Sequence, residues 1–147
     1  MDREGNDTVK GVMDVSKEYI KQCDCPEIQG LKDKPKSSRE DHNWVDGDYF
    51  VNHRGGISVY CEECQDEFGP WSTMPDWIFL PRQDQLQDMY GNKWVDTMCE
   101  FGIWINDDCA DGWYFENENK LGSMEQLWLA FVMQEKYNKT WNGEAWR

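Results

Sequence analysis

Histidine and arginine are both scarce in this chain of 147 residues, which has two histidines and five arginines. With His42 and His53 alone, a metal hydrolase site that needs several imidazoles cannot be assembled. Fifteen basic against twenty-nine acidic residues leave a net charge of −14. Such a surface repels phosphate, which disfavours direct binding of DNA or RNA and favours a partner with a basic surface. The same acidity also keeps an aromatic-rich protein in solution.

The motifs of common enzyme classes are absent as well. The sequence contains no Gly-x-Ser-x-Gly elbow, no P-loop, no Gly-x-Gly-x-x-Gly and no His-Glu-x-x-His segment. A zinc deaminase needs His-x-Glu and, later, Pro-Cys-x-x-Cys, but His53 is followed by Arg54 and Gly55, and the residue directly before Cys61 is Tyr60, not proline. Nothing marks out one carboxylate pair for glycoside hydrolysis among so many acids. The sequence therefore predicts a protein that is not an enzyme.

Long apolar runs are also missing, since no stretch approaches the roughly 20 residues needed to span a bilayer. No apolar secretory segment precedes the cysteines. We therefore expect a soluble, cytoplasmic protein without a membrane partner. Nine Trp, six Tyr and six Phe supply bulky side chains for a core. The length fits a single domain spanning residues 1–147.

Four of the six cysteines fall into two closely spaced pairs. Cys23 and Cys25 form a Cys-x-Cys, and Cys61 and Cys64 form a Cys-x-x-Cys, the spacing with which one tight turn presents two thiolates to a metal. Four soft sulfur ligands select zinc or an iron–sulfur centre over calcium or magnesium. We expect one structural zinc ion on these four residues, with His53 as an alternate ligand in place of Cys23 or Cys25.

Three other states of these cysteines compete with zinc. The thiols can be unliganded core residues, they can form disulfides in an oxidising compartment, or the Cys-x-x-Cys can be a redox pair. Glu62 and Glu63 lie between the two cysteines of that motif and disfavour a thiolate, which argues against redox work. Cys99 and Cys109 have no paired spacing, and we expect them to be small core residues.

Turn signals and apolar spacing predict the elements of the first half. A helix is expected from Asp7 or Thr8 to about Lys21, followed by an irregular linker rich in Lys, Ser and Pro. A β-hairpin follows, with a glycine-rich turn between its strands. Residues 65–80 are expected to be loop-like, ending in anchors or a short strand. The linker is expected at residues 26–41, a turn followed by the first hairpin strand at 44–52, the hairpin turn at 54–56 and the second strand at 57–60.

Helical signals dominate the second half. Helices are expected over residues 83–90, 93–104 and 123–137, the last opened by a capping box at Ser123 and buried nearly all round. An acidic loop at residues 105–119 should turn Trp113, Tyr114 and Phe115 inward as a strand. The chain is therefore predicted to be α+β: a zinc-clamped hairpin region (1–66) packed beside a Trp-rich helical half (67–147).

Three segments in the second half have unusual amino-acid sequences. They read LPRQDQLQDM at 80–89, SMEQLWLAFVM at 123–133 and KTWNGE at 139–144. Over about residues 76–147 the chain resembles a group of small uncharacterised proteins of phages and prophages of Gram-positive bacteria. A weaker likeness, based on small size, acidity and the four cysteines, is to zinc-containing anti-CRISPR inhibitors of the type II RNA-guided nuclease. The resemblance implies a mobile-element accessory protein and no particular chemistry.

Composition and resemblance together suggest an inhibitor whose carboxylates replace phosphates on a basic surface of a nucleic-acid-handling defence enzyme, most concretely a CRISPR nuclease. Two alternatives stay open: a nucleotide-binding sponge or sensor in which exposed aromatic rings stack on a base, and a non-catalytic adaptor. The scarcity of arginine favours the inhibitor over the sponge. The acidic residues expected to form the docking face are Glu62, Glu63, Asp66, Glu67, Asp107, Asp108, Asp111, Glu116 and Glu118.

Overall fold

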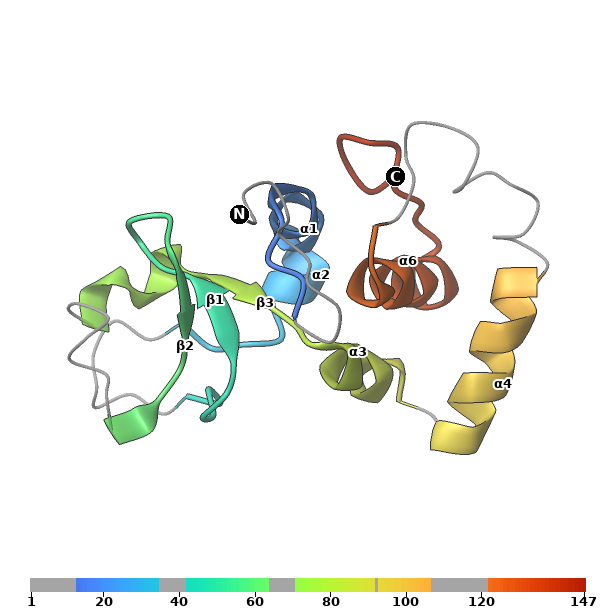
Figure 1. Cartoon of the computed structure of the whole chain (residues 1–147), viewed down its shortest axis with the longest axis horizontal. Helices are drawn as coiled ribbons and strands as arrows, with labels where there is room; N and C mark the ends of the chain where they lie inside the picture. Colours follow the sequence, from blue (N-terminus) through green and yellow to red (C-terminus); the bar gives the residue numbers. More distant parts are fainter. Residues whose placement is uncertain (1–12, 35–41, 64–70, 92, 107–121) are drawn as a thin grey trace, which may run out of the picture. The chain divides into compact units, whose positions relative to one another are not determined.

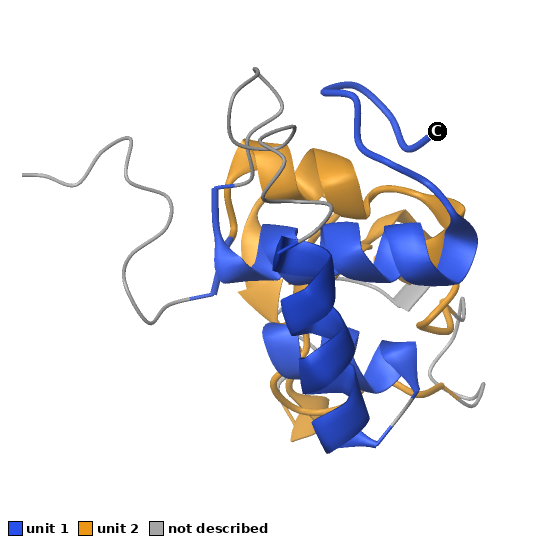
Figure 2. Ribbon diagram, turned by 90° about the vertical axis from the view of Figure 1, so that its right-hand side faces the viewer, with its two compact units in different colours: residues 1–14, 83–147 blue, residues 15–82 orange. Residues whose placement is uncertain are grey.

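A computed structural model describes residues 13–34, 42–63, 71–91, 93–106 and 122–147 (Figure 1). The described residues form five α-helices and one antiparallel three-stranded sheet, which confirms the α+β class. The chain divides into two compact units (Figure 2). We call residues 15–82 the sheet unit, and residues 1–14 with 83–147 the helical unit. Among the described residues, none of the helices has the length and apolar character required to cross a membrane.

The sheet unit contains the predicted hairpin. Strands β1 (Tyr49–Val51) and β2 (Ile57–Val59) pair antiparallel, and β3 (Ile78–Leu80) pairs with the other side of β1, giving the order β2-β1-β3. The turn between β1 and β2 is held by the Asn52 side chain, whose Oδ1 accepts from the backbone N–H groups of Arg54 at 2.9 Å and Gly56 at 3.0 Å. The hairpin is therefore confirmed.

Two helices precede the sheet, and both differ from prediction. Helix α1 (Lys17–Cys23) begins only after Ser16, whose Oγ accepts from the backbone N–H of Tyr19 at 3.2 Å. Residues 13–16 are not helical, so a helix continuous from Asp7 or Thr8 is wrong there; its expected start lies outside the described residues. The linker prediction is also wrong at α2 (Pro26–Gln29), because Pro26 at the first helical position opens a turn of helix.

Residues 71–76 form a 3-10 helix, η2 (Trp71–Asp76), where a loop was expected, and β3 follows as the expected short strand. The outer edge of β3 is closed by side chains. Gln29 donates from Nε2 to the Phe79 carbonyl at 3.0 Å and accepts at Oε1 from the Phe79 N–H at 2.9 Å. Lys34 donates to the Trp77 carbonyl at 2.6 Å. These bonds occupy the main-chain groups with which another strand would pair.

Aromatic rings fill the core on one face of the sheet. The rings of Phe50 and Trp77 stack with centroids 4.0 Å apart, and Trp44 meets Phe50, Trp77 and Phe79 edge-on. Beside them Lys32 forms an ion pair with the fully buried Asp48, with 2.7 Å between Nζ and Oδ2. This buried charge pair is one of the polar anchors of the sheet unit.

The helical unit contains α3 (Gln83–Tyr90), α4 (Trp94–Trp104) and α6 (Met124–Tyr137), which confirms three predicted helices. Ser123 caps α6 by accepting from the Gln126 N–H at 3.1 Å, as the capping box predicted. The Gln126 side chain also donates to the buried Asp14 at 2.8 Å. Every residue of α6 from Trp128 to Met133 is buried, so this helix is the core of the unit.

Candidate protein-docking surface

Helix α4 carries apolar residues around most of its circumference but buries only one side. Thr97, Phe101 and Trp104 are its buried residues, and the ring of Phe101 stacks on Trp128 of α6 with centroids 3.7 Å apart. At 100° per residue these three positions fall within one narrow arc of the helix. A single neighbouring helix face is therefore enough to cover them.

The other apolar residues of α4 face solvent. Trp94 is 77% exposed, Ile103 61%, Val95 49% and Met98 48%. We call these four side chains the α4 surface. A helix that is apolar nearly all round is normally buried, and a cluster of exposed apolar side chains typically marks an interaction site.

Cys99 also lies on the exposed side of α4, so the expectation that it is a core residue is wrong. Its place in the helix explains the exposure, because Cys99 lies well outside the arc of Thr97, Phe101 and Trp104. Cys109, for which a core position was also expected, lies outside the described residues.

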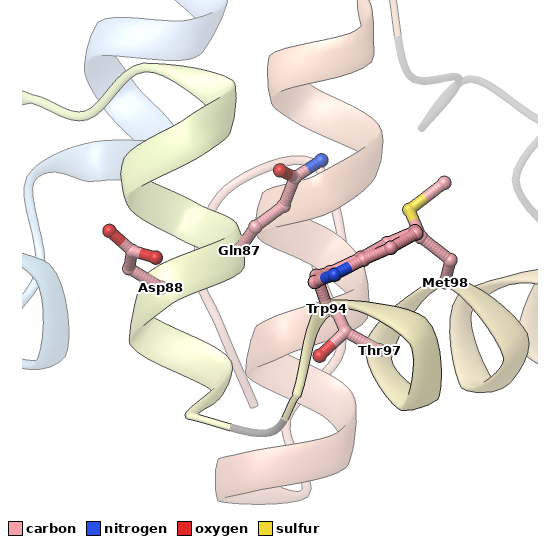
Figure 3. A pocket seen from close by; sticks show the side chains of 5 residues that line it. All are labelled: Gln87, Asp88, Trp94, Thr97 and Met98. Atoms are coloured by element: carbon pink, nitrogen blue, oxygen red, sulfur yellow. The ribbon is translucent and has the colours of Figure 1, made fainter.

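A cavity of about 200 Å³ opens beside the first turn of α4. Figure 3 shows Trp94, Thr97 and Met98 projecting from α4, and Gln87 and Asp88 from α3; these five residues line the cavity. The Thr97 hydroxyl is buried and has no hydrogen-bond partner among the described residues. An unpaired buried hydroxyl costs stability, and a ligand group entering the cavity would remove that cost.

The contact between α3 and α4 includes a polar pair. A hydrogen bond joins the Tyr90 hydroxyl to Glu100, and burial, followed by this bond and nearby carboxylates, raises the pKa of Tyr90 to about 12. Tyr90 is therefore neutral at physiological pH, and its ring packs on Phe131 of α6 with centroids 4.9 Å apart. The last residue of α3 is thus fixed to α6 by aromatic packing.

The predicted zinc ligands lie at two places in the sheet unit. Cys23 ends α1 and is buried, and Cys25 precedes α2; both helices contact β3. Cys61 follows β2, on the far side of β1, and His53 lies in the turn at the other end of the hairpin. Cys64 lies outside the described residues. Within the described ranges no three His, Cys, Asp or Glu side chains are grouped so that they could hold one metal ion.

The Cys25 thiol has a distinct electrostatic setting. Burial raises its pKa to about 11, and Sγ donates to the Gln22 carbonyl at 3.7 Å. Without a metal, Cys25 is therefore a protonated thiol at neutral pH. Because the thiolate is the reactive form, this setting disfavours redox work by Cys25.

Of the acidic residues predicted to bind a partner, the structure describes two. Glu62 and Glu63 follow β2 and are exposed, and the Glu62 carboxylate accepts from the Tyr60 hydroxyl at 2.6 Å. The other seven, Asp66, Glu67, Asp107, Asp108, Asp111, Glu116 and Glu118, lie outside the described residues.

Comparison with known proteins gives no family assignment. No family model matches the chain, and no significant match was found among curated proteins or solved structures.

Proposed function

We propose that this chain is a non-catalytic inhibitor that binds a protein partner with a basic surface. Its most concrete form is a phage-encoded anti-CRISPR protein that acts on the type II RNA-guided nuclease in the cytoplasm of a bacterial host. The observation that carries the proposal is the exposed α4 surface, two of whose side chains, Trp94 and Met98, also line the cavity. An exposed tryptophan next to a cavity is typical of the anchors that dominate binding energy in protein interfaces.

Charge complements this apolar contact. Asp88 lines the cavity, Asp96 lies in the first turn of α4, and the whole chain carries a net charge of −14. Carboxylates around an apolar centre attract a partner whose own apolar patch is rimmed with Lys and Arg, and they speed its association. A nucleic-acid-handling enzyme offers such a rim in its phosphate-binding channel. An acidic protein seated there would compete with the nucleic acid.

The direct test is a DNA-cleavage assay with a purified type II RNA-guided nuclease and its guide. Stoichiometric amounts of the chain should suppress cleavage, and raising NaCl from about 50 to 300 mM should slow association at least about tenfold, because the steering charges are screened. Full cleavage with a tenfold excess of the chain at low salt would reject this nuclease as the target. Binding without loss of cleavage would instead identify an adaptor.

The nucleotide sponge is the weaker alternative at the cavity. Trp94 offers a ring on which a base can stack. The five residues that line the cavity include a carboxylate, Asp88, and neither Lys nor Arg. A phosphate would thus meet repulsion without compensation, and a protein side chain suits this cavity better.

The zinc ion belongs to the proposal as a structural element. We propose that Cys23, Cys25, Cys61 and Cys64 bind it, with His53 as the alternate ligand, and that it ties α1 and α2 to the end of the hairpin. Support comes from the two paired spacings, Cys-x-Cys and Cys-x-x-Cys, which suit the ligands of one tetrahedral metal ion. Binding would replace the proton of each thiol with the metal.

Plasma mass spectrometry of the purified chain should find about one zinc per molecule, and replacing Cys61 and Cys64 together by Ser should remove it. The double variant should also melt at least about 10 °C lower, because the clamp between the helices and the hairpin is lost. A matched variant, Cys99→Ser on the exposed side of α4, should keep both zinc and melting temperature. A metal-free wild-type chain, with the double variant equally stable, would reject the clamp.

A further inference from the structure

The two edge strands of the sheet, β3 and β2, differ in whether side chains cover their outward main-chain groups. On β3, Gln29 and Lys34 occupy the outward main-chain groups. On β2 the structure records no such cover among the described residues. Two apolar side chains of β2 are also exposed to solvent, Ile57 at 40% and Val59 at 44%. An uncovered edge with apolar side chains is a template for pairing with another strand.

The hydrogen-bond pattern identifies which atoms of β2 are available. The Tyr60 N–H donates to the Asp48 carbonyl at 2.7 Å, and the Asn52 N–H donates to the Gly56 carbonyl at 2.8 Å. Since bonded positions alternate along an antiparallel pair, Ser58 directs its main-chain groups to β1. The N–H and C=O groups of Ile57 and Val59 therefore point outward, away from the sheet.

We propose that β2 pairs with β2 of a second copy of this chain, antiparallel and centred on Ser58, to form a continuous six-stranded sheet. In this register Ile57 lies opposite Val59 of the second copy. Both are outward-bonding positions, so the two strands can exchange hydrogen bonds without a slip of one residue. The apolar side chains of the two copies then meet across the new pair.

The charges beyond the strand fit the same register. His53 and Arg54 lie at one end of β2, and Glu62 and Glu63 at the other; all four residues are exposed. Antiparallel pairing centred on Ser58 brings Arg54 toward Glu62 and Glu63 of the second copy, twice per dimer. A parallel pairing would instead place like charges together. This complementarity favours a second copy over an unrelated strand.

The contact is short, so the expected dimer is weak and reversible. Sedimentation equilibrium of the full chain between about 10 µM and 1 mM, in 0.15 M NaCl to screen the net charge, should show monomer and dimer in exchange. Ile57→Lys should weaken the dimer at least about tenfold, because lysine on an edge strand opposes pairing. Val45→Lys is the matched control, since Val45 is exposed in the same unit and should leave the dimer intact.

A charge swap tests the register itself. Arg54→Glu and Glu62→Lys, at positions that face each other in this register, should each weaken self-association at least about fivefold, because each homodimer then pairs like charges. A one-to-one mixture of the two variants should restore association, because both contacts of the mixed dimer are complementary. A wild-type chain that stays monomeric up to 1 mM, or variants that do not recover when mixed, would overturn the proposal. Recovery in the mixture cannot result from a merely structural role of either residue.

Discussion

Replacing Ile103 with glutamate should weaken binding to the inhibited partner at least about 100-fold while leaving the fold intact. Ile103 is 61% exposed on α4, so its loss opens no cavity, and glutamate is a better helix former than isoleucine. The free energy of unfolding should change by no more than about 0.5 kcal/mol. Surface plasmon resonance against the partner and thermal melting of the free variant measure the two quantities.

The opposite side of the same helix supplies the contrast. Phe101→Ala removes the ring stacked on Trp128 and should cost about 3–5 kcal/mol of stability. Val45→Glu, an equally charged change on an exposed apolar residue of the sheet unit, should affect neither binding nor stability. If Ile103→Glu binds the partner like the wild type, the α4 surface is not the docking site.

Much of the fold could be predicted from local signals. The capping box at Ser123, the apolar spacing of residues 83–90 and the glycine-rich turn at residues 54–56 each act within a few residues, and all three elements formed as expected. Helix α2 was missed because Pro26 was interpreted only as a loop signal, although proline also suits the first turn of a helix.

The docking surface could not be located in advance for a different reason. Apolar residues surround most of α4, so periodicity alone cannot tell which side meets α6. Which side of α4 is buried depends on residues distant in sequence, such as Trp128, which stacks on Phe101. The same holds for the closed edge of β3, which depends on Gln29 reaching Phe79 across 50 positions of the chain.

Among single substitutions in the sheet unit, replacement of Asp48, which forms the buried ion pair with Lys32, should lower the free energy of unfolding most. Lys32 and Asp48 are paired at 2.7 Å, and their side chains are 11% and 0% exposed. The Asp48 carboxylate also accepts from the Val45 N–H at 2.9 Å. Replacing Asp48 with alanine removes the carboxylate that neutralises the largely buried Lys32 charge and leaves the Val45 N–H without its acceptor. We expect a loss of about 3–5 kcal/mol in the free energy of unfolding.

A double-mutant cycle measures the interaction energy between Lys32 and Asp48 separately from the cost of burying each charge. Lys32→Met combined with Asp48→Leu removes both charges and keeps apolar volume, so the double variant should cost clearly less stability than Asp48→Leu alone. Lys32 also lies 5.2 Å from the centre of the Phe79 ring and 5.8 Å from that of Trp44, and the methionine retains contact with both rings. Urea unfolding followed by tryptophan fluorescence measures each variant. Additive losses in the cycle would show that the two charges do not depend on each other.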